Sequence, residues 1–186
     1  HVDFTYEVSR SLNACEGALL LVDATQGIQA QTIATAYQAI NHNLTIIPVI
    51  NKIDLPTAAI DQARADLVDT FGFTADEILC ISAKTGQGVD HLLKAIVDRI
   101  PPPQGVPNSP LRALIFTSHF DTHKGVIIAV RIVDGQLTPH QHIRFLASGA
   151  TLLAIEVGYF TPHLLPSNSL QTGEVGYIAT GLKDVS

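Results

Sequence analysis

Residues 45–54 read Thr45-Ile46-Ile47-Pro48-Val49-Ile50-Asn51-Lys52-Ile53-Asp54, and this stretch decides the fold. Its first part is a continuous apolar run, which is typical of a strand buried on both faces of a parallel sheet. Its second part places Asn51, Lys52 and Asp54 at the carboxyl end of that strand. Because open α/β sheets bind ligands at the carboxyl ends of their strands, the stretch predicts an α/β unit with a ligand-binding loop.

The sequence on both sides of this stretch alternates strand and helix patterns. Two further apolar runs, Ala18–Val22 and Ile78–Ile81, are predicted strands. Apolar residues at helical spacing predict helices over residues 4–15, 33–40, 60–71 and 89–100. Strands separated by such helices predict a parallel sheet with right-handed crossovers, so residues 1–103 are predicted to form an α/β unit.

The helical pattern ends at the run Pro101-Pro102-Pro103-Gln104-Gly105. Three consecutive prolines cannot continue a helix and favour a stiff connector, so we place the domain boundary after residue 103. The sequence beyond it has turn signals at Asp134-Gly135 and Ser148-Gly149. Strands are predicted over residues 111–118, 125–133, 142–147, 151–157 and 175–180. Short strands without helices predict that residues 104–186 form a small antiparallel barrel.

The loop that follows residue 50 has the residue types needed to bind guanine. The Asp54 carboxylate can accept hydrogen bonds from the ring N–H and the exocyclic amine of guanine, a pair of donors that adenine does not offer. Asn51 can bond the base and connect neighbouring loops, and the aliphatic stem of Lys52 can lie across the base. Taken alone, the four residues Asn51-Lys52-Ile53-Asp54 are also compatible with a helix-capping loop before Pro56.

A second loop favours the guanine interpretation. Ser82-Ala83-Lys84 follows the next predicted strand and reaches the same edge of the sheet. The backbone N–H of Ala83 can donate to guanine O6, and Lys84 can cover the opposite face of the base, whereas a structural interpretation makes Ser82 a turn residue. Two such loops on successive strands predict a nucleotide site formed by Asn51, Lys52, Ile53, Asp54, Ser82, Ala83 and Lys84.

No metal site is predicted. His140 and His142 lie on one predicted strand, and His119 and His123 lie in the preceding hairpin. No cysteine or acidic residue stands at ligand spacing from them, so we interpret these histidines as solvated side chains of the hairpin. The two glycines of Gly86-Gln87-Gly88 lack the Lys-Ser/Thr ending of a phosphate loop and indicate a helix start.

The motifs together resemble the translational GTPases, and in particular the LepA, or elongation factor 4, family. The resemblance covers essentially the whole chain and includes residues 47–56, 82–86, 157–162 and 173–177. It departs at the hairpin of residues 118–125, which usually contains more tyrosine and arginine in that family. It implies a P-loop-GTPase-type parallel sheet, of which only the C-terminal half is present, and then domain II, an all-β translation-factor barrel that is incomplete at its C-terminal end.

The resemblance also implies a chemistry. In this family a D-x-P-G-H sequence supplies an aspartate that reaches Mg²⁺ and a histidine that orients the attacking water. The chain starts at the position of that histidine, so the resemblance makes His1 the catalytic residue. We expect an internal fragment of a GTP hydrolase that binds GTP and GDP, with the phosphate loop, switch I and Mg²⁺ ligands upstream. We further expect the isolated chain to be inactive, and Leu19–Val22 to become an unpaired apolar edge.

Partners and location follow from the resemblance alone. It implies binding to the elongating ribosome with bound tRNA, and a role in back-translocation or translation fidelity. It implies a cytoplasmic protein, and it leaves open peripheral association with the bacterial inner membrane and an organellar matrix. We expect neither a sequence-specific nucleic-acid partner nor a stable homo-oligomer. Two alternatives stay open, namely another translational GTPase of the elongation factor G or BipA type, and a non-hydrolysing ribosome-binding module.

Composition and charge agree with folded domains. The 186 residues are 46% hydrophobic and 15% charged, so the chain is not of the disordered class. The net charge of −6 arises in residues 1–103, and neither half has the basic surface that binds nucleic acid by phosphate neutralisation alone. No apolar run reaches the roughly 18 residues that a membrane helix needs. Cys15 and Cys80 are predicted to be reduced core thiols.

Overall fold

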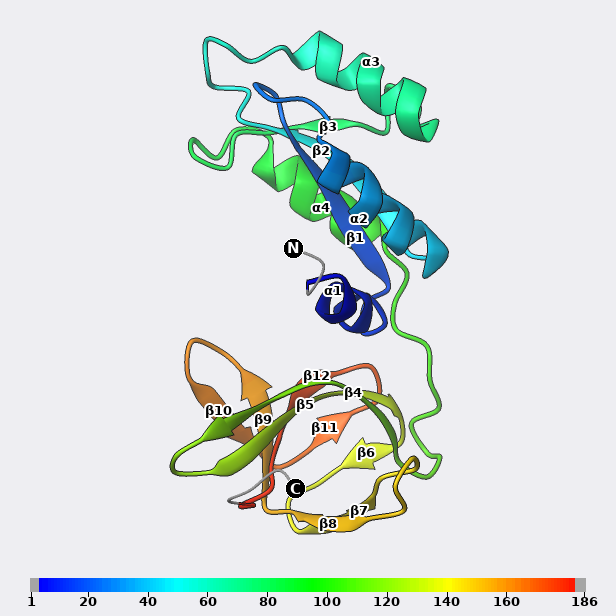
Figure 1. The fold of residues 1–186 in the computed structure, drawn as a ribbon, viewed down its shortest axis with the longest axis vertical. Helices are drawn as coiled ribbons and strands as arrows, with labels where there is room; N and C mark the ends of the chain where they lie inside the picture. The colour runs from blue at the N-terminus through cyan, green and yellow to red at the C-terminus, as the bar shows by residue number, and fades with distance from the viewer. Residues whose placement is uncertain (1–3, 183–186) are drawn as a thin grey trace. The chain divides into compact units, whose positions relative to one another are not determined.

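The computed structural model describes residues 4–182 of the chain (Figure 1). Its internal contacts divide the chain into two compact units. The first unit is residues 15–101, and the second combines residues 102–182 with residues 4–14. Helix α1 (Phe4–Leu12) falls in the second unit because it contacts strand β4 (Arg112–Asp121), whereas the sequence pattern placed it in the α/β half. The functional domain boundary after residue 103 stays a prediction.

The first unit is a three-stranded parallel sheet with helices. The strand order is β1 (Gly17–Asp23), β2 (Thr45–Asn51) and β3 (Leu79–Cys80). Helices α2 (Ala30–Asn41), α3 (Ile60–Phe71) and α4 (Val89–Arg99) follow the three strands in turn. In β1 and β2, Gly17 pairs with Thr45 and Asp23 pairs with Asn51, so the two strands end at the same level.

The sheet separates two apolar cores. One core contains side chains of β1, β2, α2 and α3: Leu20, Val22, Ala36, Ile50, Ala63 and Leu67. The other contains side chains of β2, of the segment after β3 and of α4: Ile47, Val49, Ile81 and Leu92. Because side chains alternate along a strand, both faces of β2 are buried, which explains its continuous apolar sequence.

Strand β1 lies at one edge of this sheet within the part of the chain that is described. Leu19 and Leu21 pair with Ile47 and Val49 and therefore share the face on which α4 packs. They are nevertheless 40% and 53% exposed, because α4 packs against β2. The predicted apolar edge is thus present. Helix α4 also exposes residues that its pattern placed on the buried face, namely Leu93 and Val97.

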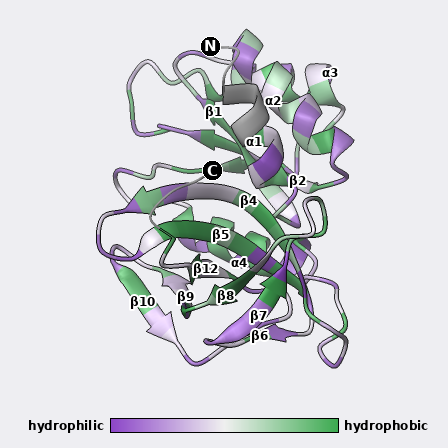
Figure 2. Ribbon diagram, turned by 60° about the horizontal axis from the view of Figure 1, so that its bottom comes forward, coloured by the Kyte–Doolittle hydropathy of each residue, from purple (hydrophilic) through white to green (hydrophobic). Residues whose placement is uncertain are grey.

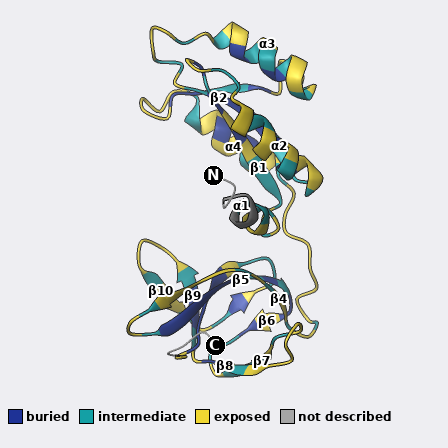
Figure 3. Cartoon of the chain, in the orientation of Figure 1, coloured by how far each residue is buried: buried dark blue, intermediate teal, exposed yellow. Residues whose placement is uncertain are grey.

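The second unit is antiparallel throughout its described strands. Five strands form one sheet in the order β10 (Leu164–Ser167), β9 (Glu156–Phe160), β12 (Val175–Ala179), β5 (Gly125–Asp134) and β4. Two ribbons pair β6 (Gln136–Leu137) with β11 (Leu170–Gln171) and β7 (Gln141–Arg144) with β8 (Thr151–Ala154). Strand β5 is the most apolar and most buried of them, as Figures 2 and 3 show. Its residues Val130 and Ile132 lie in the core of the unit.

The structure corrects the predicted strands in two places. The strand predicted over residues 151–157 is two strands, β8 and β9, and the chain changes its pairing partner from β7 to β12 between them. The N–H of Ile155, at the break, donates to the carbonyl of Ala179 at 3.0 Å. The strand predicted over residues 142–147 ends at Arg144, because the chain turns back and the N–H of Gly149 donates to the carbonyl of Phe145.

Two further findings concern predictions from composition. Cys15 is exposed rather than in a core, and Cys80 is half-buried with its sulfur 3.1 Å from a guanidinium nitrogen of Arg64. Among residues 4–182, none of the helices has the length and apolarity that crossing a membrane requires.

Candidate functional site

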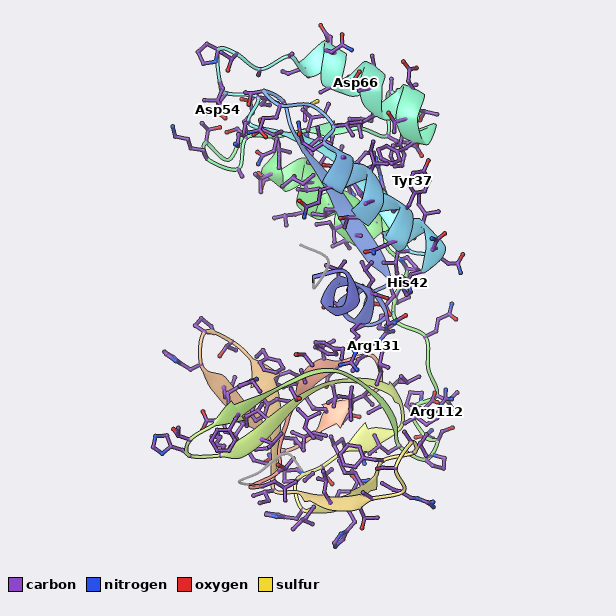
Figure 4. The ribbon with its side chains drawn as sticks, viewed as in Figure 1. Tyr37, His42, Asp54, Asp66, Arg112 and Arg131 are labelled. Carbon is purple, nitrogen blue, oxygen red and sulfur yellow. The ribbon has the colours of Figure 1, made fainter. Side chains whose placement is uncertain are left out.

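Three loops leave the sheet of the first unit at one edge, after β1, β2 and β3. Backbone hydrogen bonds join them: the N–H of Ala24 donates to the carbonyl of Asn51 at 2.9 Å, and the N–H of Ile53 donates to the carbonyl of Ile81 at 3.3 Å. Figure 4 shows Asp54 on the loop that follows β2, at this end of the sheet. The two predicted loops are therefore neighbours in space.

The side chain of Asn51 connects the second and third loops. Its Oδ1 accepts hydrogen bonds from the N–H of Lys52 at 2.8 Å and from the N–H of Ala83 at 3.0 Å. The loop-connecting role predicted for Asn51 is thus observed as geometry. The N–H of Ala83, which the sequence suggested as a donor to guanine O6, donates to Asn51 here, so a base would share this donor with Asn51.

Asp54 is fixed from the third loop. The hydroxyl of Ser82 donates to Oδ1 of Asp54 at 2.7 Å. This bond lowers the pKa of Asp54 below its ordinary value, whereas partial burial opposes the shift and Lys84 assists it. An ionised carboxylate has about four acceptor positions, so the bond from Ser82 leaves capacity for two more donors. The half-buried Asp54 therefore presents a charged acceptor suited to two adjacent N–H groups.

The third loop is anchored by Ser82, whose side chain is fully buried. Its Oγ accepts a hydrogen bond from the N–H of Thr85 at 3.1 Å, and its backbone N–H donates to the carbonyl of Gln87 at 2.9 Å. The chain then passes through Gly88, which has a φ of +74°. A side chain there would meet the carbonyl oxygen of Cys80 at 2.5 Å, so this turn requires glycine.

One participant, Asp23 at the end of β1, was not among the predicted site residues. Its Oδ2 lies 2.5 Å from the Nζ of Lys52, and its Oδ1 accepts hydrogen bonds from the N–H and the hydroxyl of Thr25 at 2.9 and 2.7 Å. The bond from Lys52, followed by those from Thr25, lowers the pKa of Asp23 to about 2. Like Asn51, Asp23 is a polar residue at the carboxyl end of a predicted strand, and this signal in the sequence could have identified it.

The predicted residues differ in burial in a way that suits a binding loop. Ser82 is buried, Asn51, Ile53 and Asp54 are half-buried, and Ala83, Lys52 and Lys84 are exposed. Ile53 packs against the core shared by α2 and α3. The arrangement combines a fixed carboxylate with exposed lysines on the same two loops, which suits a planar base with two adjacent N–H donors. His1, predicted as the catalytic residue, lies outside the described residues.

The described residues do not form a magnesium site. Residues 4–182 contain no group of three histidine, cysteine, aspartate or glutamate side chains arranged to hold a metal ion. The acidic residue nearest the strand ends, Asp23, is engaged by Lys52 and Thr25.

An open hollow of about 440 Å³ lies elsewhere, in the second unit. Its lining includes Asn108, Gln136, Gln141 and Gln171. Gln141 accepts a hydrogen bond from the N–H of Thr138 at 3.1 Å, and Gln171 donates to the hydroxyl of Ser169 at 2.8 Å. These amides stabilise turns, so the strand-end loops are the better site candidate.

Comparison with known proteins finds a family model and similar relatives. The family model of the elongation factor Tu GTP binding domain matches residues 1–102. Elongation factor 4 of Thermobifida fusca is 56% identical over 185 residues, which is 100% of this chain and 30% of that protein. Elongation factor 4 of Thermotoga maritima is 54% identical over 186 residues, again 100% of this chain and 30% of that protein. The chain thus spans about 30% of the length of these curated relatives.

A solved structure shows the same fold. The apo crystal structure of translation elongation factor SelB from Methanococcus maripaludis matches with a TM-score of 0.73 and 22% identity, over 90% of this chain and 37% of that chain. The resemblance to elongation factor 4 that the motifs carry is confirmed by the similar relatives. With the family model matching more than half of its residues, the chain belongs to the family of the elongation factor Tu GTP binding domain.

Proposed function

We propose that residues 51–54 and 82–84 bind the guanine base of GTP and GDP in a GTP hydrolase of the elongation factor 4 type. The observation that carries the proposal is the Asp54 carboxylate, which Ser82 fixes through one oxygen while its remaining acceptor positions are available to a ligand. Guanine presents the ring N–H and the exocyclic amine on one edge, and a carboxylate accepts both. The exposed stems of Lys52 and Lys84 supply the two faces against which the base lies.

The proposal extends to the whole gene product. Residues 1–103 are the C-terminal half of a P-loop-type G domain, and residues 104–186 are the domain II barrel. His1 orients the attacking water, and Mg²⁺ is held by residues upstream. The partner is the elongating ribosome with bound tRNA, and the activity is back-translocation or a fidelity function in the cytoplasm, with peripheral membrane association as a further expectation. The names of the similar relatives and the family match support this extension.

The test replaces one carboxylate oxygen of Asp54, a hydrogen-bond acceptor, with an amide NH₂, a donor. In xanthine a carbonyl oxygen stands where guanine has its exocyclic amine, so an amide NH₂ in place of the carboxylate suits xanthine and disfavours guanine. Asp54→Asn in the intact gene product should lose affinity for GDP and gain affinity for xanthosine diphosphate, measured with fluorescent nucleotide analogues. Asp61→Asn, on α3, is the matched control and should retain the preference for GDP. Equal GDP affinity in both variants would contradict the proposal.

A further inference from the structure

The ion pair between Asp23 and Lys52 has features that an ordinary surface pair lacks. Asp23 Oδ2 and Lys52 Nζ are 2.5 Å apart, and the two side chains are 19% and 50% exposed. Ordinary surface pairs, such as Lys94–Asp98 on α4 at 2.7 Å, contribute little to the free energy of unfolding. The Asp23–Lys52 pair, in contrast, joins the ends of two adjacent strands and includes a residue of the guanine loop.

The backbone of Lys52 adopts an unusual conformation. Its φ is +66°, in the left-handed region that residues other than glycine seldom occupy. Such conformations persist where surrounding contacts enforce them. Here the N–H of Lys52 is held by Oδ1 of Asn51 at 2.8 Å, and its ammonium is held by Asp23. The lysine is therefore fixed at both ends while its side chain stays half exposed.

Asp23 is also held by a residue other than the lysine, Thr25. The N–H and hydroxyl of Thr25 both donate to its Oδ1, so Oδ2 is the oxygen presented to Lys52. The bond from Lys52, followed by those from Thr25, lowers the pKa of Asp23 to about 2, so the carboxylate is charged at any physiological pH. The Asp23 carboxylate is thus a preorganised anchor rather than a mobile surface group.

We propose that Asp23 is a positioning residue of the nucleotide site, which holds the Lys52 ammonium at the end of β1 so that the lysine stem forms a fixed wall against one face of the purine base. The inference rests on the proposed guanine site and adds a residue to it. A stem fixed in advance loses less freedom when the base binds, so affinity increases. Contact with a base face does not depend on the groups at the base edge, which Asp54 reads. Asp23 therefore sets affinity for any base that the site accepts, and Asp54 sets the choice among bases.

The test uses Asp23→Asn in the intact gene product. The amide keeps an oxygen for Thr25 but presents an NH₂ to the lysine in place of a carboxylate oxygen. GDP and inosine diphosphate are the two probes, because inosine lacks the exocyclic amine that Asp54 accepts. Asp23→Asn should weaken binding of both by the same factor, roughly threefold to fivefold, with the ratio of their affinities unchanged. The matched control, Asp98→Asn, removes an exposed Lys–Asp pair on α4 and should leave both affinities unchanged.

A double-mutant cycle identifies the lysine as the route of the effect. In a Lys52→Met background, Asp23→Asn should have no further effect on GDP affinity, because the ammonium it positions is absent. Three results would overturn the inference: wild-type affinities in Asp23→Asn, a reduced ratio of GDP to inosine diphosphate affinity, or an undiminished effect in the Lys52→Met background. The second result would mean that Asp23 supports the whole loop, including Asp54. Wild-type protein that does not prefer GDP to ADP would instead contradict the proposed function itself.

Discussion

The hydroxyl of Ser82 donates a 2.7 Å hydrogen bond to Oδ1 of Asp54, a residue 28 positions earlier in the chain. Ser82 is fully buried, and its oxygen also accepts the N–H of Thr85 at 3.1 Å. The hydroxyl is therefore a fixed element between two loops, and it determines which oxygen of Asp54 faces the protein. The other acceptor positions of this half-buried carboxylate are the ones that the proposed base would use.

Ser82→Ala should weaken GDP binding. The variant removes the donor to Asp54 and leaves the N–H of Thr85 without its acceptor. A hydrogen bond to a charged group contributes about 1.5 to 3 kcal/mol, so we expect about a tenfold or greater loss in affinity. Titration with a fluorescent GDP analogue measures it. Thr35→Ala, which removes a hydroxyl bonded to the Gln31 carbonyl on α2, is the control, and equal affinities in the two variants would refute this role of Ser82.

The same bond predicts a pH dependence. The hydrogen bond from Ser82 lowers the pKa of Asp54 below 3.8, against partial burial, which raises it. Because the folded-state pKa is depressed, the stabilisation is fully present above the unfolded value of 3.8 and is lost as the pH falls through the lower folded value. GDP affinity depends on Asp54 of the folded protein, so it should be level from about pH 8 to pH 5 and decrease only below pH 3.8, as this carboxylate becomes protonated. In Ser82→Ala the decrease should begin at higher pH, and affinity profiles of the two proteins that coincide would contradict the assignment.

The strand-end residues show how far the sequence determines the site. Asn51 and Ser82 could be predicted because each follows a recognisable apolar run, and parallel strands bring their carboxyl ends to one edge. The contact between Asp23 and Lys52 could not be predicted, because it depends on the register of β1 against β2 and on a left-handed backbone at a lysine. No local pattern contains either property.

The all-β unit shows the same limit. Strand β5 could be predicted because its apolar sequence is long. In the structure it pairs with a strand on each side. The break at Ile155 could not, because the residues on either side are equally strand-like and differ only in the strand they pair with. Strands β6 and β11 are two residues long, too short for any periodicity to indicate them. Pairing, rather than propensity, determines these parts of the fold.

Two glycines of the third loop provide a matched pair of variants. Gly86 and Gly88 have φ values of +84° and +74°, so alanine at either position adopts an unfavourable conformation that costs about 1 to 2 kcal/mol. A Cβ at Gly86 has open space, whereas a Cβ at Gly88 meets the carbonyl oxygen of Cys80 at 2.5 Å. Gly88→Ala should therefore lower the free energy of unfolding by at least about 1 kcal/mol more than Gly86→Ala, measured by urea denaturation. Equal losses would show that the loop can relax away from β3.

The second unit contains a charged network, half-buried around the fully buried Tyr177, whose energy can be measured. The hydroxyl of the fully buried Tyr177 donates to Oε1 of Glu156 at 2.6 Å, and Lys124 forms an ion pair with the same oxygen. Burial raises the pKa of Glu156, but the bonds from Lys124 and Tyr177 outweigh it and lower the pKa. Tyr177→Phe should reduce the free energy of unfolding by about 1.5 to 3 kcal/mol. Tyr159→Phe, at a half-buried tyrosine whose hydroxyl donates to Glu174 at 2.9 Å, should cost less, and the reverse order in thermal denaturation would contradict this account.

The exposed edge of the first unit predicts self-association of the 186-residue chain at high concentration. Among the described strands of the first unit, β1 pairs along one side only, with β2, and Leu21 on it is 53% exposed. Leu21→Lys should reduce association, measured by light scattering over a concentration series, because a charge on an edge strand opposes strand addition. The fold should change little, since Leu21 lies outside both cores. Leu20→Lys is the contrasting variant: Leu20 is 7% exposed and packs with α2 and α3, so a buried charge there should unfold the unit and increase association. If Leu21→Lys associates as strongly as the wild-type chain, the edge of β1 is not the surface through which copies meet.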